Sequence, residues 1–425
     1  EMGIKTVAVY STTDRESLHV QIADEAVCIG GPQLKDSYLN MKSILAAAVG
    51  TGAEAIHPGF GFLSENSEFA RLCEECHVKF IGPRSETIEL MGNKANARMR
   101  MMQSDVPVIP GSKGFIQDTA EALEIADRVG YPVLLKAAAG GGGKGIRVVQ
   151  DRQEMKTAFT QAKQEAQHVK HLEIQVFRDQ AGHTLAFPER DCSVQRNKQK
   201  MIEESPCPIL TEKERQELQS IAIKATDALN YVNTGTIECL MDQAHHFYFM
   251  EMNTRIQVEH TVSEMITGVD IVREQVRIAA GLELDITQAD LTPHGVSLEC
   301  RINAEDPARD FLPQSGKVDY LYLPTGNLGV RIDTELYPQW TISAFYDSMV
   351  AKFVSWGPNR QEAIAKMKRV LDEAVIKGVQ TNIEFHQAFL ECDGQFAKGT
   401  VTTDYLEKHF LPEWKKGLNH ETLRK

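Results

Sequence analysis

The stretch TGTIECLMDQAHHFYFMEMNTRIQVEH, residues 234–260, holds two runs of strand-forming residues on either side of a polar turn. GTIECLM and HFYFMEMN are rich in β-branched and aromatic residues, and they flank the polar residues 243–246. This pattern predicts two antiparallel strands joined as a hairpin. A turn centred between Ala244 and His245 places Glu238 directly opposite Glu251.

Two glutamates that face each other across a strand pair repel, so their pairing needs a compensating group. A bound cation is one such group, and Mg²⁺ prefers carboxylate oxygens together with substrate phosphates. Asn253 lies two residues beyond Glu251 and therefore on the same strand face. The pattern predicts a metal site at Glu238, Glu251 and Asn253, and the alternative is that both glutamates are solvated on an exposed face.

Three further polar residues continue the alternation beyond the hairpin. Arg255, Gln257 and Glu259 follow at intervals of two, so they are predicted to line one face of the same strand. A cation, an amide and a carboxylate in a row are suited to hold a small anion and to remove a proton from it.

A second unusual stretch is KAAAGGGGKGIRVV, residues 136–149. Glycines allow the backbone to approach a ligand and to direct N–H groups at an anion. The segment after them reads as a strand rather than a helix, and Gly145 rather than Ser or Thr follows Lys144, so neither a dinucleotide fingerprint nor a Walker loop fits. We predict a flap that closes over a nucleotide, with a mobile hairpin tip as the alternative; its glycines are Gly140, Gly141, Gly142 and Gly143.

Composition describes an ordinary globular chain. Its 425 residues, 42% apolar and 25% charged, are enough for two or three domains. The net charge of −13 and the absence of a basic run argue against nucleic acid binding. No apolar stretch predicts a membrane span and no signal peptide is recognisable, so the expected location is the cytoplasm.

The eight cysteines are mostly single and stand in apolar contexts, which predicts reduced core thiols. CEECH at residues 73–77 matches a haem attachment pattern, but it lies where a helical pattern runs into a strand. It also lacks the second C-x-x-C that a zinc site requires.

The order of periodic segments divides the chain. Short apolar runs alternate with helical patterns near the N-terminus, which predicts an open parallel α/β sheet. Thr211 and Glu214 form a capping box that begins a helix. Alternating strands such as VSLECRINA, residues 296–304, and a long helix over 359–378 predict a mixed sheet and helix region at the C-terminus.

Eight blocks of sequence carry a resemblance to a known family. They are HPGFGFLSEN, GNKANAR, KAAAGGGGKGIRVV, ERDCSVQR, EMNTRIQVEH, SEMITGVD, ECRINAEDP and YDSMVAK. In this order, over nearly the whole chain, they resemble biotin carboxylase, the ATP-grasp subunit of bacterial acetyl-CoA carboxylase and its relatives. The resemblance implies an α/β and α+β ATP-grasp fold with three domains: an open parallel α/β domain at 1–90, an ATP-grasp domain at 91–282 with a mobile glycine-rich lid at about 109–168, and a mixed sheet domain at 283–425.

The resemblance implies an enzyme that carboxylates biotin with bicarbonate through carboxyphosphate, using ATP and Mg²⁺ or Mn²⁺. In the family this is the first half-reaction of acetyl-CoA carboxylase in fatty acid synthesis. The chain has no A-M-K-M biotinylation motif, so biotin is expected on a separate carrier protein or elsewhere in a longer chain. Carboxyltransferase subunits and a homodimer are also implied.

The family's site residues transfer to matching positions here. The nucleotide side comprises Lys94, Lys136, the glycines 140–143, His171, Gln195, Lys198 and Leu240. The bicarbonate and biotin pocket comprises Arg255, Gln257, Val258, Arg301, Phe60 and Gly61. The catalytic set is Glu259 as the base, Arg301 for the biotin enolate, and Arg255 and Lys200, beside the metal ligands Glu238, Glu251 and Asn253.

The sequence also departs from the family pattern. Lys198 stands in place of a usual histidine, Phe60 replaces a frequent tyrosine, and the family's first strand and helix and its adenine-contacting segment near 167–168 are not recognisable. A surface salt bridge from Arg301 to Glu299 or Glu305 is an alternative to its catalytic role. Another ATP-grasp ligase with an acyl-phosphate intermediate, and a catalytically silent nucleotide-binding scaffold, are the alternative functions.

Overall fold

The computed structural model describes residues 2–108, 119–131, 133–136, 146–149, 151–155 and 169–422. Within these ranges no helix combines the length and apolar character needed to cross a bilayer. Seven of the cysteines are recorded as free thiols, and five of those seven are buried, which agrees with the predicted core thiols.

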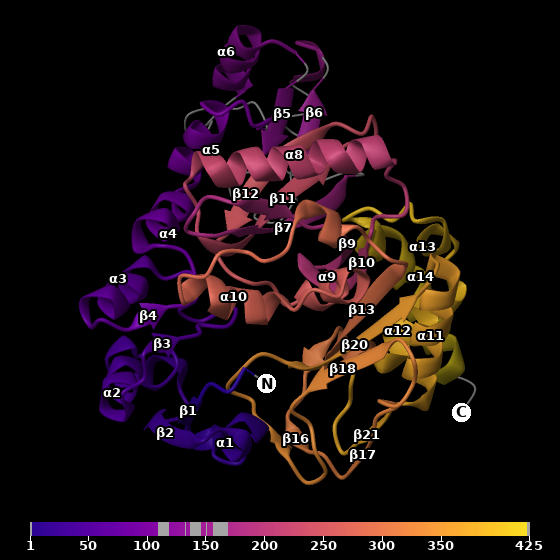
Figure 1. The fold of residues 1–425 in the computed structure, drawn as a ribbon. Coiled ribbons are helices and arrows are strands. Elements are labelled where there is room, and N and C mark those ends of the chain that lie inside the picture. Colours follow the sequence, from indigo (N-terminus) through magenta and orange to yellow (C-terminus); the bar gives the residue numbers. More distant parts are fainter. Residues whose placement is uncertain are drawn as a thin grey trace.

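The N-terminal region contains parallel strand pairs covered by helices, as the alternation predicted (Figure 1). Within the described residues these strands form two separate parallel pairs, and the second pair spans only two residues in each strand. The elements are β1 (Val7–Ser11), η1 (Thr12–Asp14), α1 (Leu18–Ile22), β2 (Glu25–Gly30), η2 (Leu34–Asp36), α2 (Met41–Thr51), β3 (Ala55–Ile56), α3 (Ser67–Glu75), β4 (Lys79–Phe80) and α4 (Ser85–Gly92).

The CEECH stretch lies where α3 ends and β4 follows, as its pattern predicted. Cys73 is fully buried among Phe69, Ala70 and Phe80 in the core of this region. Cys73 is therefore a packing residue.

The segments on either side of the glycine-rich stretch are antiparallel strands, as predicted. β5 (Val133–Lys136) pairs with β6 (Ile146–Val149), and both follow α5 (Lys94–Met102) and α6 (Thr119–Val129). The glycines 140–143 and much of the proposed lid lie outside the described residues. Figure 1 draws α6, β5 and β6 together at one end of the molecule.

A nine-stranded sheet forms the centre of the protein. Its order is β12-β11-β7-β9-β10-β13-β20-β18, with β8 paired to β7. The strands are β7 (Lys170–Arg178), β8 (Thr184–Ala186), β9 (Arg190–Arg196), β10 (Gln199–Ser205), β11 (Asn233–Met241), β12 (Phe247–Asn253), β13 (Val296–Asn303), β18 (Val330–Thr334) and β20 (Met349–Gly357). The pairing of β10 with β13 continues this sheet across the boundary proposed at residue 283.

Helices and short strands complete the C-terminal half. Between the hairpin and β13 lie α9 (His260–Thr267), α10 (Ile271–Ala279) and η3 (Gln288–Leu291). The remaining elements are β14 (Glu305–Asp306), η4 (Pro307–Arg309), β15 (Leu312–Pro313), β16 (Gly316–Lys317), β17 (Tyr320–Tyr322), β19 (Thr341–Ile342), α11 (Arg360–Glu373), β21 (Val375–Lys377), α12 (Ile383–Cys392), α13 (Gly394–Lys398), η5 (Leu406–Phe410) and α14 (Leu411–Thr422).

The helix predicted over 359–378 is shorter in the structure, because its last residues form a strand. It ends at Glu373, and Val375–Lys377 forms β21, which pairs with β17. The β-branched residues Val375 and Ile376 suit this strand better than a helical turn.

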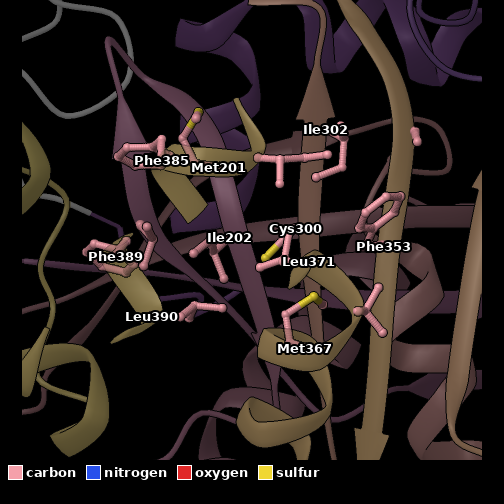
Figure 2. Packing of buried hydrophobic residues seen from close by; sticks show 14 of the residues in the cluster. Met201, Ile202, Cys300, Ile302, Phe353, Met367, Leu371, Phe385, Phe389 and Leu390 are labelled. Carbon is pink, nitrogen blue, oxygen red and sulfur yellow. The ribbon is translucent and has the colours of Figure 1, made fainter. Parts of the chain in front are cut away.

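The part of the sheet formed by β10, β13 and β20 packs one face against α11 and α12. Figure 2 shows this core between the two layers. In β13, Cys300 and Ile302 point into it, so Glu299 and Arg301 lie on the opposite face, as the alternation predicted. The labelled side chains are Met201 and Ile202 from β10, Cys300 and Ile302 from β13, Phe353 from β20, Met367 and Leu371 from α11, and Phe385, Phe389 and Leu390 from α12.

The predicted capping box is present at the start of α8 (Glu212–Ala228). The Thr211 hydroxyl accepts the Glu214 N–H, and the Glu214 carboxylate accepts the Thr211 N–H at 2.7 Å. Thr211→Ala is expected to lower the free energy of unfolding by about 0.5–2 kcal/mol, because one N-terminal N–H loses its partner. Urea unfolding followed by circular dichroism measures this loss, and Thr211→Ser, which keeps the hydroxyl, should retain wild-type stability.

Candidate active site

The hairpin register agrees with the prediction. β11 and β12 run antiparallel with Glu238 opposite Glu251 and Thr236 opposite Asn253. The turn is fixed by the Asp242 carboxylate, which accepts the N–H groups of Ala244 and His246 at 2.9 Å each. Beside the turn Leu240 pairs with Tyr248 and Cys239 with Phe249, and a β-bulge between Cys239 and Glu238 shifts the register by one residue, so the predicted pair depends on this bulge as well as on the turn.

Glu238 lies at the centre of a group of hydrogen-bond donors. Its Oε1 accepts from the side chains of Asn253 at 2.7 Å, Gln257 at 2.9 Å and Lys200 at 3.3 Å, while His171 Nε2 lies 3.2 Å from its Oε2. Burial alone would raise the pKa of Glu238, but Lys200 and His171 hold it well below its usual value. The alternative of a solvated Glu238 is therefore wrong.

The oxygen-rich pair fits a Mg²⁺ ion in residue type. Two carboxylates face each other, and the Asn253 side chain is close enough to donate its amide N–H to Glu238. The Asn253 oxygen points the other way and lies 3.5 Å from Arg255 Nη2. A half-turn of this amide would direct its oxygen towards Glu238, and carboxylate and amide oxygens are ligands that Mg²⁺ prefers.

Lys200 links the hairpin to the predicted base. Its ammonium lies 2.5 Å from Glu259 Oε1, 2.5 Å from Glu173 Oε2 and 3.3 Å from Gln257 Oε1. Burial alone would lower the pKa of Lys200, but the carboxylates of Glu173, Glu259 and Glu238 raise it well above its usual value. Lys200 is therefore a permanent cation within this group of carboxylates.

The predicted continuation of β12 is wrong. The strand ends at Asn253, and residues 254–259 turn before α9 begins. The cause is a distant partner, because Glu65 accepts the Thr254 N–H at 3.1 Å and the Arg255 Nε–H at 2.9 Å. Arg255 therefore contacts Glu65 instead of lining one face with Gln257 and Glu259.

Arg301 reaches the same cluster from β13. Its Nη2 lies 2.8 Å from Glu259 Oε2, and its Nε donates to Glu203 Oε1 at 2.6 Å. The alternative of a surface bridge to Glu299 or Glu305 is wrong, because the guanidinium is mostly buried and pairs with Glu203 and Glu259.

Glu259 is thus held between two cations. Burial would raise its pKa, but Lys200 and Arg301 keep it well below its usual value. The carboxylate is ionised at neutral pH, and each oxygen contacts one cation.

Two charged residues of this site, Glu173 and Arg190, were not among the predicted ones. Glu173 shares its carboxylate between Lys200 and Arg190, whose Nε lies 2.5 Å from Glu173 Oε1. The side chains of Glu173 and Arg190 are fully buried. The alternation in HLEIQV, residues 171–176, places Glu173 on the same face as His171, a signal that was open to recognition.

Not all of the other predicted residues lie in this cluster. His171 accepts the Gln195 amide N–H on Nδ1 at 2.7 Å, which places both beside Glu238, and Leu240 is buried in β11. Lys198 is exposed at the turn between β9 and β10.

The remaining predictions concern backbone positions and side chains of the outer loops. The Val258 carbonyl accepts from Lys352 at 2.9 Å. Phe60 and Gly61 lie on a loop where Phe60 is 38% exposed and Gly61 has a φ of 77°. Lys94 opens α5 and Lys136 ends β5, but both side chains lie outside the described part of the chain.

His386 forms a hydrogen bond with the backbone of Arg301. Its Nε2 donates to the Arg301 carbonyl at 2.9 Å, and Asn382 donates to the same oxygen at 3.0 Å. Burial lowers the pKa of His386 from 6.5 to about 4. Below pH 6.5 this histidine binds a proton in the unfolded state but not in the folded state. The stability that neutral His386 contributes is therefore fully present above pH 6.5 and is lost as the pH falls towards 4.

We expect the stability of the wild type to fall more steeply over this window than that of His386→Gln. Urea midpoints measured at both ends of the window test this difference. Equal losses in the two proteins would contradict it.

Comparisons with known proteins give consistent matches along the chain. Three family models match successive parts, described as the N-terminal domain of biotin carboxylase (residues 1–88), the ATP-binding domain of the carbamoyl-phosphate synthase L chain (residues 93–287) and the C-terminal domain of biotin carboxylase (residues 299–408).

Individual relatives cover almost the same length. Biotin carboxylase 1 of Bacillus subtilis is 48% identical over 96% of this chain and 94% of its own. A crystal structure of the biotin carboxylase subunit of pyruvate carboxylase has a TM-score of 0.86 at 43% identity, covering 97% of this chain and 94% of that one. The biotin carboxylase domain dimer of Hydrogenobacter thermophilus 2-oxoglutarate carboxylase, solved with MgADP, ADP and bicarbonate, has a TM-score of 0.84 at 43% identity, covering 96% of this chain and 92% of that one.

Proposed function

Because the chain belongs to the biotin carboxylase family, we propose that it carboxylates carrier-linked biotin with bicarbonate, consuming ATP in the presence of Mg²⁺. The observation that carries this proposal is the position of Glu259, whose two oxygens contact Lys200 and Arg301 next to Glu238. This arrangement brings a base, two cations and an acidic metal ligand into one cluster. The biotin carboxylase models that match both ends of the chain argue against another kind of ATP-grasp ligase.

The hairpin would hold the metal, and residues from several other elements would hold most of the nucleotide. Glu238, Glu251 and Asn253 would hold Mg²⁺, which would supply positive charge to neutralise the phosphates of ATP. Lys94, Lys136 and the glycines 140–143 would contact the phosphates, while His171, Gln195, Lys198 and Leu240 would border the nucleotide.

The proton transfer belongs to Glu259. In the structure this carboxylate is a weak base, because both oxygens are paired with cations. An anionic substrate such as bicarbonate that recruits Lys200 or Arg301 would weaken one pair and raise the basicity of Glu259. Glu259 would then take the proton of bicarbonate. A bicarbonate oxygen would attack the γ-phosphorus of ATP, so that ADP leaves and carboxyphosphate forms.

The biotin side would be formed by Arg301 with Arg255, Gln257 and Val258 and by the loop at Phe60 and Gly61. A guanidinium is suited to the enolate oxygen of biotin, since it stays charged and donates in a fixed fork. Arg301 would then contact substrate through the edge that now faces Glu259.

The wider assembly is part of the proposal. A biotin carboxyl carrier protein would present biotin, and carboxyltransferase subunits would pass the carboxyl group to acetyl-CoA in fatty acid synthesis in the cytoplasm. A homodimer is supported by the related domain dimer. The acceptor needs its own test, because relatives include parts of pyruvate and 2-oxoglutarate carboxylases.

The test of the reaction is ADP release with bicarbonate, measured with and without free biotin. We expect ADP release that biotin raises well above the rate with bicarbonate alone and that stops when EDTA removes the metal. Release that ignores biotin would point to another ligase, and no release would point to the silent scaffold. Co-purification with a carrier and a carboxyltransferase, followed by assays with several acyl-CoA and keto-acid acceptors, identifies the acceptor.

A further inference from the structure

Two buried glutamates behind Arg301 have no role in the proposed reaction. Glu203 of β10 is the direct cross-strand partner of Glu299 of β13. Directly opposite side chains in an antiparallel pair lie on the same face, close enough to interact. Both residues are fully buried, at 0% exposure.

Each of these carboxylates has one oxygen with a partner and one without. Glu203 Oε1 accepts from Arg301 Nε at 2.6 Å, and Glu299 Oε2 accepts from the Thr261 hydroxyl of α9. The other two oxygens, Glu203 Oε2 and Glu299 Oε1, are buried and have no hydrogen-bond partner among the described residues. An unsatisfied buried acceptor is destabilising, and two on facing carboxylates add charge repulsion.

One proton removes both defects. A protonated carboxyl donates an O–H, and an ionised one accepts it, so a single shared proton satisfies both free oxygens and halves the buried charge. We propose that Glu203 and Glu299 share one proton at neutral pH and act together as a positioning pair for Arg301. This inference rests on the proposed function for its effect on turnover, but the shared proton itself does not.

The surrounding charges support a pair with a single negative charge. Burial raises the pKa of Glu203 to about 8, with Arg301 opposing and Glu299 adding to the shift. Burial also raises the pKa of Glu299, against Lys352 and Arg301. Lys352 has other partners, since it lies 2.9 Å from the Val258 carbonyl and 3.4 Å from Asp333.

The remaining charged groups that face the pair are Lys200 on the strand of Glu203 and Glu259 at the start of α9. Lys200 is already shared among Glu173, Glu238 and Glu259. Arg301 is therefore the cation that the Glu203–Glu299 pair shares with Glu259.

This sharing links the proton to biotin carboxylation. With one proton, the pair places one negative charge behind the guanidinium, and Glu259 places another in front of it. Loss of the proton at alkaline pH would double the charge behind Arg301 and draw the guanidinium away from the biotin side. Biotin-dependent turnover is thus expected to fall as the pair ionises.

Infrared spectroscopy tests the proton without turnover. The wild type at neutral pH should show a protonated carboxyl stretch that fades as the pH rises through about 8 and that is absent from Glu299→Gln. Glu204→Gln is the matched control, because this buried neighbour has both oxygens bonded to Arg360, at 2.6 and 3.1 Å, and its removal should leave that stretch unchanged. A wild type without the stretch, or an unchanged stretch in Glu299→Gln, overturns the proposal.

The pH profile of biotin-dependent ADP release tests the positioning role. In Glu299→Gln an amide N–H permanently replaces the shared proton, so the alkaline limb should move up by about one pH unit or more. Glu204→Gln should keep the wild-type limb. An unmoved limb in Glu299→Gln overturns the positioning role, whereas a protein with the infrared signal and no biotin-dependent release would refute the proposed function and retain the shared proton.

Discussion

Glu259→Gln is expected to slow biotin-dependent ADP release by about 100- to 10,000-fold, the usual contribution of a general base. The structure gives the reason, because Glu259 is the carboxylate that contacts both Lys200 and Arg301. An amide keeps the size of the side chain but accepts no proton at neutral pH, and its N–H₂ group would face a cation. Steady-state kinetics with free biotin measure this loss.

Nucleotide binding should be retained in the same variant, since among the described residues Glu259 pairs with Lys200, Arg301 and Cys192 rather than with His171 or Gln195 of the nucleotide side. Calorimetric titration with ATP checks this point. Glu264→Gln is a suitable control, because Glu264 is a partly buried glutamate of α9, the helix that follows Glu259, and it pairs with Arg331 rather than Lys200. Near-wild-type turnover of Glu259→Gln would remove the base assignment.

Arg301→Lys is expected to lower biotin-dependent turnover by about 100- to 1,000-fold, the range found when one oxyanion donor is lost. Lysine keeps the charge between Glu203 and Glu259 but cannot reproduce the fork that donates to both of them at 2.6 and 2.8 Å. The positive charge limits the damage to folding, because neither carboxylate is left without a cation.

The decisive comparison for Arg301→Lys is between two activities of one sample. Bicarbonate-dependent ADP release without biotin should fall much less than the biotin-dependent rate. Arg360→Lys offers a matched control, since Arg360 also binds a buried glutamate, Glu204, but lies outside the cluster. Equal losses in both activities would show that Arg301 acts on the whole site rather than on biotin.

Local patterns predicted the hairpin but not its continuation. The two strands and their turn are visible in one short stretch of sequence, whereas the β-bulge between Glu238 and Cys239 that brings Glu238 opposite Glu251 is not. The end of β12 depends on Glu65, which is 189 residues away from Thr254 in the chain. No periodicity near Thr254 reports such a partner, so the shared face of Arg255, Gln257 and Glu259 was predicted wrongly.

The burial of charged residues was the other feature that local sequence patterns did not predict. Glu173, Arg190 and Glu203 are fully buried, although charged residues are ordinarily on the surface. Their partners come from different strands, and strand order is not written in local periodicity. The family resemblance supplied Lys200 and Arg301, whereas the pairing of Glu203 with Glu299 emerged only from the register of β10 and β13.

The junction of β10 with β13 bears on any attempt to dissect the protein. A fragment that stops before β13 would lack the strand that pairs with Ile202–Ser205 of β10. The backbone N–H and C=O groups of β10 would then lie unpaired at a sheet edge. The apolar side chains of Met201 and Ile202 would lose their cover at the same time. Such a fragment is expected to aggregate, and the shared sheet predicts that the parts before and after β13 fold together although they match separate family models.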